Sequence, residues 1–372
     1  MKKTSSYFDD IVLTRGGEDD IFNPFPGLRP YSINESHLFF GREGQSEEVL
    51  DQLAENRFVA VIGASGSGKS SLMYCGVVPI LYGGFITSAG SRWEIITTRP
   101  GSSPLENLAI SIVKNELSEK YDEENNEHVN KTAIVRSILK TGSLGLAEAL
   151  KYSKTGDSNI LVLVDQFEEL FRFKKTQGEI EGVNESVAFV KLLLEAVRQQ
   201  DLPVYIILTM RSDFIGECAQ FHELTELIND SHYLIPQMTR IDLKQAIEGP
   251  VAVGGGKISP HLVQQLLNDV GDNPDQLPIL QHALMRTWDY WAKHRNIERE
   301  ITLIHYDNIG RMQKALSDHA NEAYDDIKQD WNNYFPLVKH KGVILLHDIF
   351  FAPDIRYFWK ELQEYYDTYE IY

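Results

Sequence analysis

The sequence predicts an α/β fold, a three-layer sandwich with a mostly parallel sheet, followed by a helical subdomain and a short aromatic-rich α/β tail. Short, almost entirely apolar runs alternate with segments of helical spacing, which is typical of parallel strands that helices cover on both faces. The first of these runs leads directly into a glycine-rich loop and a helix. Because crossovers between parallel strands are right-handed, such runs and helices assemble into one layered sandwich.

Five runs are the predicted strands, and helical spacing precedes the first of them and follows the last. The strand candidates are Phe58–Ile62, Trp93–Thr98, Ile160–Val164, Val204–Leu208 and a weaker Tyr233–Ile235. The helix candidates on either side of them are Ser46–Glu55, Asp242–Glu248, His261–Asp269, Leu277–His294 and Ile309–Ile327. The mainly helical pattern after Met238 predicts a separate helical unit.

The chain is expected to divide into four parts. Residues 1–22 are a polar and acidic flexible leader, and residues 23–236 form the α/β core. Residues 237–328 form the helical subdomain. Residues 329–372 form the tail, because 12 of the 39 aromatic residues lie within residues 331–372. That change in composition indicates either a domain boundary or an aromatic packing helix of the same domain.

Composition and charge exclude several classes of protein. Apolar residues make up 42% of the 372 residues and charged residues 24%, as in an ordinary globular protein. The apolar runs are far shorter than a membrane span and the N-terminus lacks the apolar core of a signal peptide, so we expect no membrane partner. With only Cys75 and Cys218 as cysteines, the cytoplasm is the expected location. The net charge of −18 opposes broad binding to nucleic acid.

A complete G-x-x-x-x-G-K-S motif follows the first strand. It comprises Gly63, Ala64, Ser65, Gly66, Ser67, Gly68, Lys69 and Ser70, and Ser71 extends the predicted nucleotide-binding residues. Its glycines let backbone N–H groups surround a phosphate, and the N-terminus of the next helix adds positive potential. In such a loop Lys69 reaches the β- and γ-phosphates, and Ser70 offers its hydroxyl to Mg²⁺. The alternative is a chance match in a glycine-rich turn. The motif predicts the P-loop NTPase form of the sandwich.

The third strand ends in a carboxylate, Asp165. Because this end of a parallel strand lies at the sheet edge that carries the phosphate loop, Asp165 is expected to hold Mg²⁺ opposite Ser70. Many related ATPases place a water-polarising glutamate directly after this aspartate, but the next residue here is Gln166. We therefore assign the catalytic base to Glu168 or Glu169, or expect weak hydrolysis. The alternative is that both glutamates complement a helix dipole.

Arg211 follows the fourth strand at the same predicted edge. An arginine there can approach the γ-phosphate and report whether it is present. The alternative is an ordinary edge arginine that pairs with Asp213. We favour the sensor role because neighbouring strands converge on this edge.

The order of these motifs resembles the STAND class of signal-transduction NTPases, specifically the novel STAND group of bacterial conflict-associated proteins, over residues 23–328. The matching segments are Asn23–Tyr31, Phe39–Glu43, Arg57–Gly63, Asp165–Leu170, Arg211–Phe214, Glu248–Pro250 and Gln276–Leu284. The resemblance implies that Phe40, Gly41 and Arg42 lie near the nucleotide base, and that Arg211 is the sensor arginine. It also implies that residues 237–328 include a lid and the start of a winged-helix-like region, and that Pro278 belongs to this subdomain, which closes over the nucleotide. A core position for Phe40 and a helix N1 position for Pro278 are the alternatives.

Members of this class are usually switches, in which ADP/ATP exchange and self-association turn on an effector domain. The resemblance therefore implies a Mg²⁺-dependent ATPase with slow turnover, with ATP or ADP as ligand, Mg²⁺ as cofactor, self-association on ATP binding and a protein partner still to be identified. We expect neither an effector domain in the 22 residues before Asn23 nor a sensor repeat after residue 328. The alternatives are a nucleotide-binding interaction module with little or no hydrolysis, a truncated or fused product, and a DNA-loading ATPase, which the acidic charge disfavours.

The last 45 or so residues resemble a late fragment of class I S-adenosylmethionine-dependent methyltransferases. Tyr334–Ile349 is similar to a late strand of such enzymes, and Phe358–Leu362 to the helix after it. The glycine-rich cofactor loop of those enzymes has no counterpart in the sequence. We therefore expect no S-adenosylmethionine binding.

Overall fold

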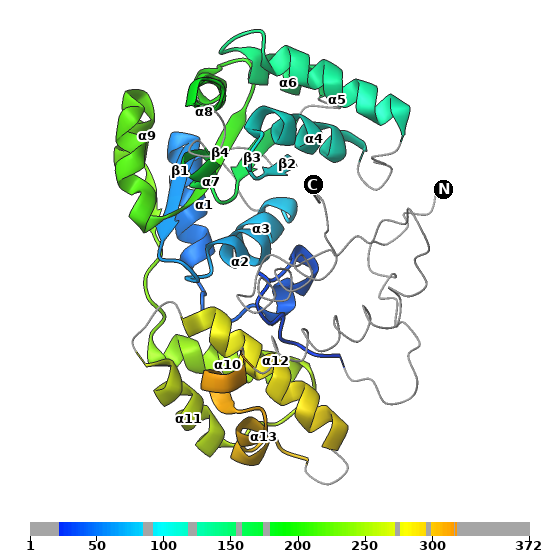
Figure 1. Cartoon of the computed structure of the whole chain (residues 1–372), viewed down its shortest axis with the longest axis vertical. Coiled ribbons are helices and arrows are strands. Elements are labelled where there is room, and N and C mark those ends of the chain that lie inside the picture. Colours follow the sequence, from blue (N-terminus) through cyan, green and yellow to red (C-terminus); the bar gives the residue numbers. More distant parts are fainter. Residues whose placement is uncertain are drawn as a thin grey trace, which may run out of the picture.

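The computed structural model describes residues 22–84, 92–117, 125–153, 158–173, 179–271, 276–294, 299–315 and 317. An α/β part forms one end of the molecule and a group of helices the other (Figure 1). All of the predicted leader except Phe22, and the whole predicted tail with its methyltransferase-like segments, lie outside the described residues.

Within the described residues, five parallel strands form one sheet in the order β2-β3-β4-β1-β5. The strands are β1 (Phe58–Gly63), β2 (Trp93–Thr98), β3 (Asn159–Val164), β4 (Val204–Arg211) and β5 (His232–Leu234). All five predicted strands are confirmed, and β4 continues three residues further than predicted, to Arg211. Because β4 lies between β1 and β3, the carboxyl ends of β1 and β3 are separated by one strand only.

The alternation of side chains along the strands supplies two apolar cores, one on each face of the sheet. In β1, Phe58, Ala60 and Ile62 face one core, and Val59 and Val61 face the other. The first core is covered by α4 (Pro104–Leu117), α5 (Asn126–Leu139), α6 (Gly145–Ser153), α7 (Glu169–Phe173), α8 (Glu179–Arg198) and α9 (His222–Asp230). The second is covered by α1 (Gln45–Asn56), η2 (Leu72–Val77) and α3 (Val78–Tyr82). The predicted three-layer sandwich is confirmed.

The helix after the glycine-rich loop is not a regular α-helix. It begins as α2 (Lys69–Ser71), continues as the π-helix η2 and ends as α3. A π-helical turn widens the helix and changes the direction of the side chains that follow, and such turns are frequent at functional sites.

The described helices after β5 have an apolar core of their own, with Trp288 and Tyr306 fully buried in it. They are α10 (Arg240–Val253), α11 (Pro260–Val270), α12 (Leu277–His294) and α13 (Leu303–Asn308). The first three confirm predicted helices, and α10 begins at a capping box between Thr239 and Asp242. Of the predicted helix Ile309–Ile327, residues 311–315 and 317 are helical, and 316 and 318–327 lie outside the described residues. The sequence pattern missed α13.

None of the described helices combines the length and hydropathy needed to cross a membrane.

Candidate nucleotide-binding site

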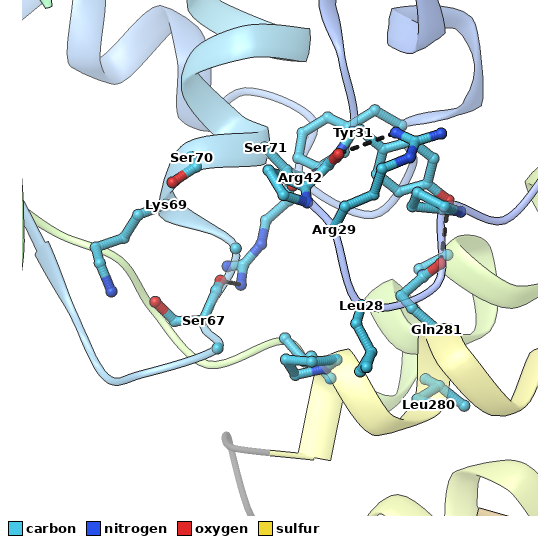
Figure 2. A pocket seen from close by; sticks show the side chains of 18 of the residues that line it. Leu28, Arg29, Tyr31, Arg42, Ser67, Lys69, Ser70, Ser71, Leu280 and Gln281 are labelled. Carbon is cyan, nitrogen blue, oxygen red and sulfur yellow. Dashed lines mark hydrogen bonds between the residues drawn. The ribbon is translucent and has the colours of Figure 1, made fainter. Parts of the chain in front are cut away.

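A cavity of about 360 Å³ opens where the carboxyl end of the sheet meets the helices after β5. The residues that line it include the glycine-rich loop from Ser65 to Ser71, the N-terminal segment Pro26–Tyr31 and the first turn of α12. Figure 2 shows Ser67 and Lys69 of the loop on one side of the cavity, with Leu28 and Leu280 across from them. The volume is within the range of small-molecule sites.

The glycine-rich loop has the backbone that its sequence predicts. Gly66 and Gly68 adopt left-handed conformations with φ of 69° and 88°, which a residue with a side chain would adopt only under strain. The Lys69 ammonium folds back over the loop and donates hydrogen bonds to Gly63 O at 3.0 Å and Ala64 O at 2.7 Å. Burial lowers the pKa of Lys69, and the carboxylates of Glu168 and Asp165 oppose that shift.

Asp165 is fully buried and brings four side chains together. Ser70 Oγ and Thr209 Oγ1 both donate to its Oδ1, at 2.8 and 2.7 Å. Its Oδ2 accepts from Tyr74 OH at 3.2 Å and from Arg99, whose Nε and Nη2 lie at 3.1 and 2.9 Å. The structure therefore joins the predicted pair Ser70–Asp165. It adds three residues that the sequence analysis missed.

The oxygen chemistry of this pair fits a magnesium ion. The Ser70 hydroxyl and the Asp165 carboxylate are hard oxygen donors of the kind that Mg²⁺ prefers. They lie within hydrogen-bonding distance of each other, and Ser70 also lines the cavity. Among the described residues, no cluster of three or more acidic, histidine or cysteine side chains offers a metal site elsewhere.

The chain after Asp165 separates the two candidate bases. Gln166 adopts a left-handed conformation with φ of 58°, and its N–H donates to Thr209 Oγ1 at 3.0 Å. After this turn Glu168 is buried, lines the cavity and accepts from the Arg211 N–H at 3.3 Å. Glu169 instead accepts from the Gly101 N–H at 2.9 Å, in the loop after β2.

The surroundings of Glu168 disfavour its charged form. Burial raises the pKa of Glu168 above its ordinary value, and the Arg211 N–H together with the charges of Lys69 and Arg211 opposes that shift. A carboxyl group in such surroundings is better suited to proton transfer near neutral pH than an exposed one.

Arg211 both lies at the cavity and pairs with Asp213, the two alternatives that the sequence left open. It lines the cavity beside Glu168. Its guanidinium also forms a bidentate ion pair with Asp213, with Nε–Oδ1 and Nη2–Oδ2 distances of 3.0 and 2.8 Å.

Phe40, Gly41 and Arg42 lie between the cavity and α10. Arg42 is 6% exposed and donates to Ser67 O at 2.8 Å and Pro236 O at 2.7 Å, so it ties the glycine-rich loop to the segment after β5. Phe40 lines the cavity and packs against Gly249 of α10. Gly41, with φ of 81°, approaches α10 so closely that an added Cβ would lie 2.4 Å from Asp242 O.

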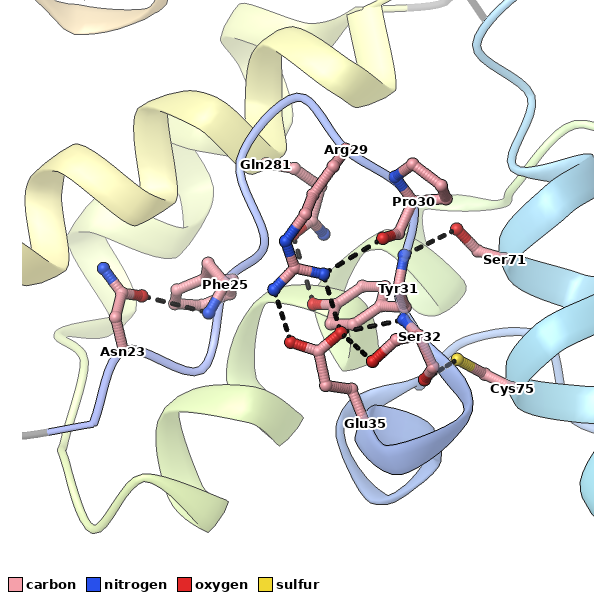
Figure 3. A network of polar contacts seen from close by, with 10 residues as sticks. All are labelled: Asn23, Phe25, Arg29, Pro30, Tyr31, Ser32, Glu35, Ser71, Cys75 and Gln281. Atoms are coloured by element: carbon pink, nitrogen blue, oxygen red, sulfur yellow. Dashed lines mark hydrogen bonds and ion pairs between the residues drawn. The ribbon is translucent and has the colours of Figure 1, made fainter. Parts of the chain in front are cut away.

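The N-terminal segment joins the helices after β5 to the glycine-rich loop. Asn23 donates to Met285 O and to Asp289 of α12, and Tyr31 OH donates to Gln281 Oε1 at 3.2 Å. The Tyr31 N–H donates to Ser71 Oγ at 3.3 Å, at the end of the glycine-rich loop (Figure 3).

Two further contacts complete this end of the cavity. Arg29 holds the segment in place through a bidentate ion pair with Glu35 (Figure 3). Pro278 lines the cavity as the second residue of α12, one position after the predicted N1.

The family model of the Novel STAND NTPase 1 group matches residues 24–338. The chain belongs to that family. The match extends ten residues beyond the expected end at 328 and includes the first part of the predicted tail, residues 329–338. With the parallel sheet and the glycine-rich loop, it makes the chain an α/β P-loop NTPase that binds nucleotide.

Solved structures similar to this chain are distant from it in sequence. Cdc6p from Pyrobaculum aerophilum is 11% identical with a TM-score of 0.41, and the match covers 70% of this chain and 64% of that one. Aeropyrum pernix ORC1, solved in complex with DNA, is 15% identical with a TM-score of 0.49, and the match covers 90% of this chain and 80% of that one. The Walker-type ATPase PABY2304 of Pyrococcus abyssi is 12% identical with a TM-score of 0.45, and the match covers 91% of this chain and 92% of that one. This chain thus spans less than two thirds of the Cdc6p chain, and no curated protein matches its sequence.

Proposed function

We propose that the chain is a Mg²⁺-dependent ATP-binding NTPase of the STAND type, which hydrolyses ATP slowly and acts as a nucleotide-controlled conformational switch. The observation that carries the proposal is the 2.8 Å hydrogen bond between Ser70 and Asp165, which lie 95 residues apart in sequence. It joins the phosphate-loop motif to the acidic strand end beside a cavity of suitable size.

In this proposal the backbone amides from Gly63 to Gly68 and the Lys69 ammonium bind the phosphates. Ser70 and Asp165 would hold Mg²⁺, which when bound would neutralise phosphate charge. Arg211 approaches the γ-phosphate and senses it. Phe40, Gly41 and Arg42 would lie near the nucleotide base, and Pro278 would belong to the subdomain that closes over the nucleotide.

Glu168 is the better candidate for the residue that orients and deprotonates the attacking water. It faces the cavity, its pKa is raised by burial, and Lys69 and Arg211 lie close to it. Glu169 is engaged with the loop after β2, so we assign it a structural role. Thr209 holds Asp165 and the Gln166 backbone in place and is a positioning residue.

The composition of the cavity wall supports the switch part of the proposal. Residues of the proposed core (23–236) and of the proposed helical subdomain (237–328) both line the cavity, so a bound nucleotide would affect how the two parts approach each other. Exchange of ADP for ATP, followed by self-association in the cytoplasm, would then pass the signal to a protein partner. A setting in bacterial conflict is carried by family membership alone.

A second candidate is a nucleotide-binding interaction module with little or no hydrolysis. Gln166 favours it, because an amide side chain directly after Asp165 cannot accept the proton of the attacking water.

Phosphate release from ATP at increasing protein concentration separates the two candidates. The switch predicts turnover that rises with concentration as the protein self-associates, and Asp165→Asn should suppress turnover while ATP still binds. No turnover at any concentration, with ATP bound, would favour the interaction module. Full activity of Asp165→Asn would remove Asp165 from the mechanism.

A further inference from the structure

The Arg99 guanidinium contacts the carboxylate to which we assign the magnesium ion. Its Nε and Nη2 lie 3.1 and 2.9 Å from Asp165 Oδ2. The side chain of Asp165 is 1% exposed, whereas that of Arg99 is 46% exposed. A buried carboxylate is thus paired with a cation that has solvent beside it.

The sheet itself places Arg99 there. Strands β2 and β3 pair in parallel with Thr98 opposite Val164, and the Asp165 N–H donates to Thr98 O at 2.9 Å. Arg99, the residue directly after β2, therefore emerges beside Asp165. Asn107 of α4 donates to Arg99 O and Pro100 O and fixes this turn.

The two oxygens of Asp165 have different partners. Oδ1 accepts from the neutral hydroxyls of Ser70 and Thr209. Oδ2 accepts from Arg99 and from Tyr74, which the π-helix η2 directs toward it. Oδ1 thus has two neutral partners, one from the phosphate loop and one from β4, whereas Oδ2 already has a positive partner.

We propose that Arg99 is an internal competitor of Mg²⁺ for Asp165, and that it sets the Mg²⁺ concentration at which the protein holds its nucleotide. This inference rests on the proposed function, in which Asp165 is a magnesium ligand. Two cations close to one carboxylate repel each other, so the arriving ion weakens the Arg99–Asp165 pair. Arg99 can leave because its side chain is half-exposed, whereas Asp165 is held by two hydroxyl groups.

The competition also couples the metal to the loop after β2. This loop contacts the segment after β3 at two points: Arg99 pairs with Asp165, and the Gly101 N–H donates to Glu169. Departure of Arg99 would leave the Gly101–Glu169 hydrogen bond to hold that side of the loop. Magnesium binding would thereby be reported to α4.

The test is a Mg²⁺ titration of the full chain in the presence of a fluorescent, non-hydrolysable ATP analogue. Arg99→Gln removes the competing charge and is expected to lower the half-saturating Mg²⁺ concentration about tenfold, equivalent to about 1.4 kcal/mol. Arg99→Lys keeps the charge and should stay close to the unmodified protein. Arg136→Gln is the matched control, because Arg136 is 43% exposed and pairs with Glu106 away from the cavity.

The outcomes are distinguishable. An unchanged half-saturating concentration in Arg99→Gln would overturn the inference. A higher one would also overturn it, because Arg99 would then assist binding. If Arg99→Gln melts at a lower temperature than Arg136→Gln, Arg99→Lys takes its place in the test. A marked difference in half-saturating Mg²⁺ concentration between Arg99→Lys and the unmodified protein would then contradict the role of the charge. If the unmodified protein binds no analogue at any Mg²⁺ concentration, the proposed function itself fails.

Discussion

Arg42 offers the sharpest test of how the cavity is held together. Its buried guanidinium donates to Ser67 O at 2.8 Å, to Pro236 O at 2.7 Å and to Gln45 Oε1 at 3.2 Å. The first two contacts connect the glycine-rich loop to the segment that leads into α10. Arg42→Ala would leave both carbonyl groups without this donor.

The expected cost follows from these two contacts. A hydrogen bond to a charged group contributes about 1.5–3 kcal/mol net, so the two carbonyl contacts together contribute about 3–6 kcal/mol. The Arg42 side chain is buried, which lowers its pKa and disfavours the charged form, so truncation recovers part of that penalty. We therefore expect Arg42→Ala to lower the free energy of unfolding by about 3 kcal/mol, near the lower end of this range.

Urea unfolding followed by circular dichroism measures this change. Arg198→Ala is the matched control: Arg198 also contacts two partners, Glu195 and Glu223, but its side chain is 50% exposed. Exposed pairs contribute about 0–1 kcal/mol, so the control should barely shift the curve. Arg42→Lys should fall between Arg42→Ala and the unmodified protein, because an ammonium cannot span both carbonyl groups as a guanidinium does. Equal unfolding curves for Arg42→Ala and Arg198→Ala would refute the reasoning.

Two further predictions concern Glu168 and Gly41. Glu168→Gln should suppress phosphate release whereas Glu169→Gln should not, and equal loss in both would refute the assignment of the base. The pKa of Glu168 in the folded protein is raised above its ordinary value of 4.5, so its contribution to stability should fall as the pH rises from 4.5 through the folded-state pKa. Melting temperatures of Glu168→Gln and the unmodified protein, measured across this pH range, should differ by an amount that changes with pH. A difference that does not change with pH would contradict the raised pKa. Gly41→Ala should lower the melting temperature more than Gly44→Ala, since both have φ near 80° but only a Cβ at Gly41 would meet Asp242 O; equal shifts would argue against the close approach to α10.

The strands and the phosphate loop could be predicted from the sequence because their signals are local. The five apolar runs and the glycine-rich motif can each be recognised from consecutive residues. Because parallel strands present their carboxyl ends at one edge of the sheet, Ser70 and Asp165 could be expected to lie close together. The structure has this contact at 2.8 Å. The helices α10 to α12 were equally visible in their apolar periodicity.

The remaining contacts of the site depend on geometry that no local pattern carries. Arg99 reaches Asp165 through the register of β2 against β3, and Tyr74 reaches it through a π-helical turn. The distinction between Glu168 and Glu169 depends on the left-handed backbone at Gln166, a residue type in which that conformation is uncommon.

Calorimetric titration of ATP with Mg²⁺ into the full chain and into Lys69→Ala tests the central claim most directly. We expect saturable binding to the unmodified protein and no detectable binding to Lys69→Ala, because the loop then loses the ammonium beside Gly63 and Ala64. Equal affinity of the two proteins for ATP would contradict it, since the nucleotide would then bind somewhere other than the glycine-rich loop.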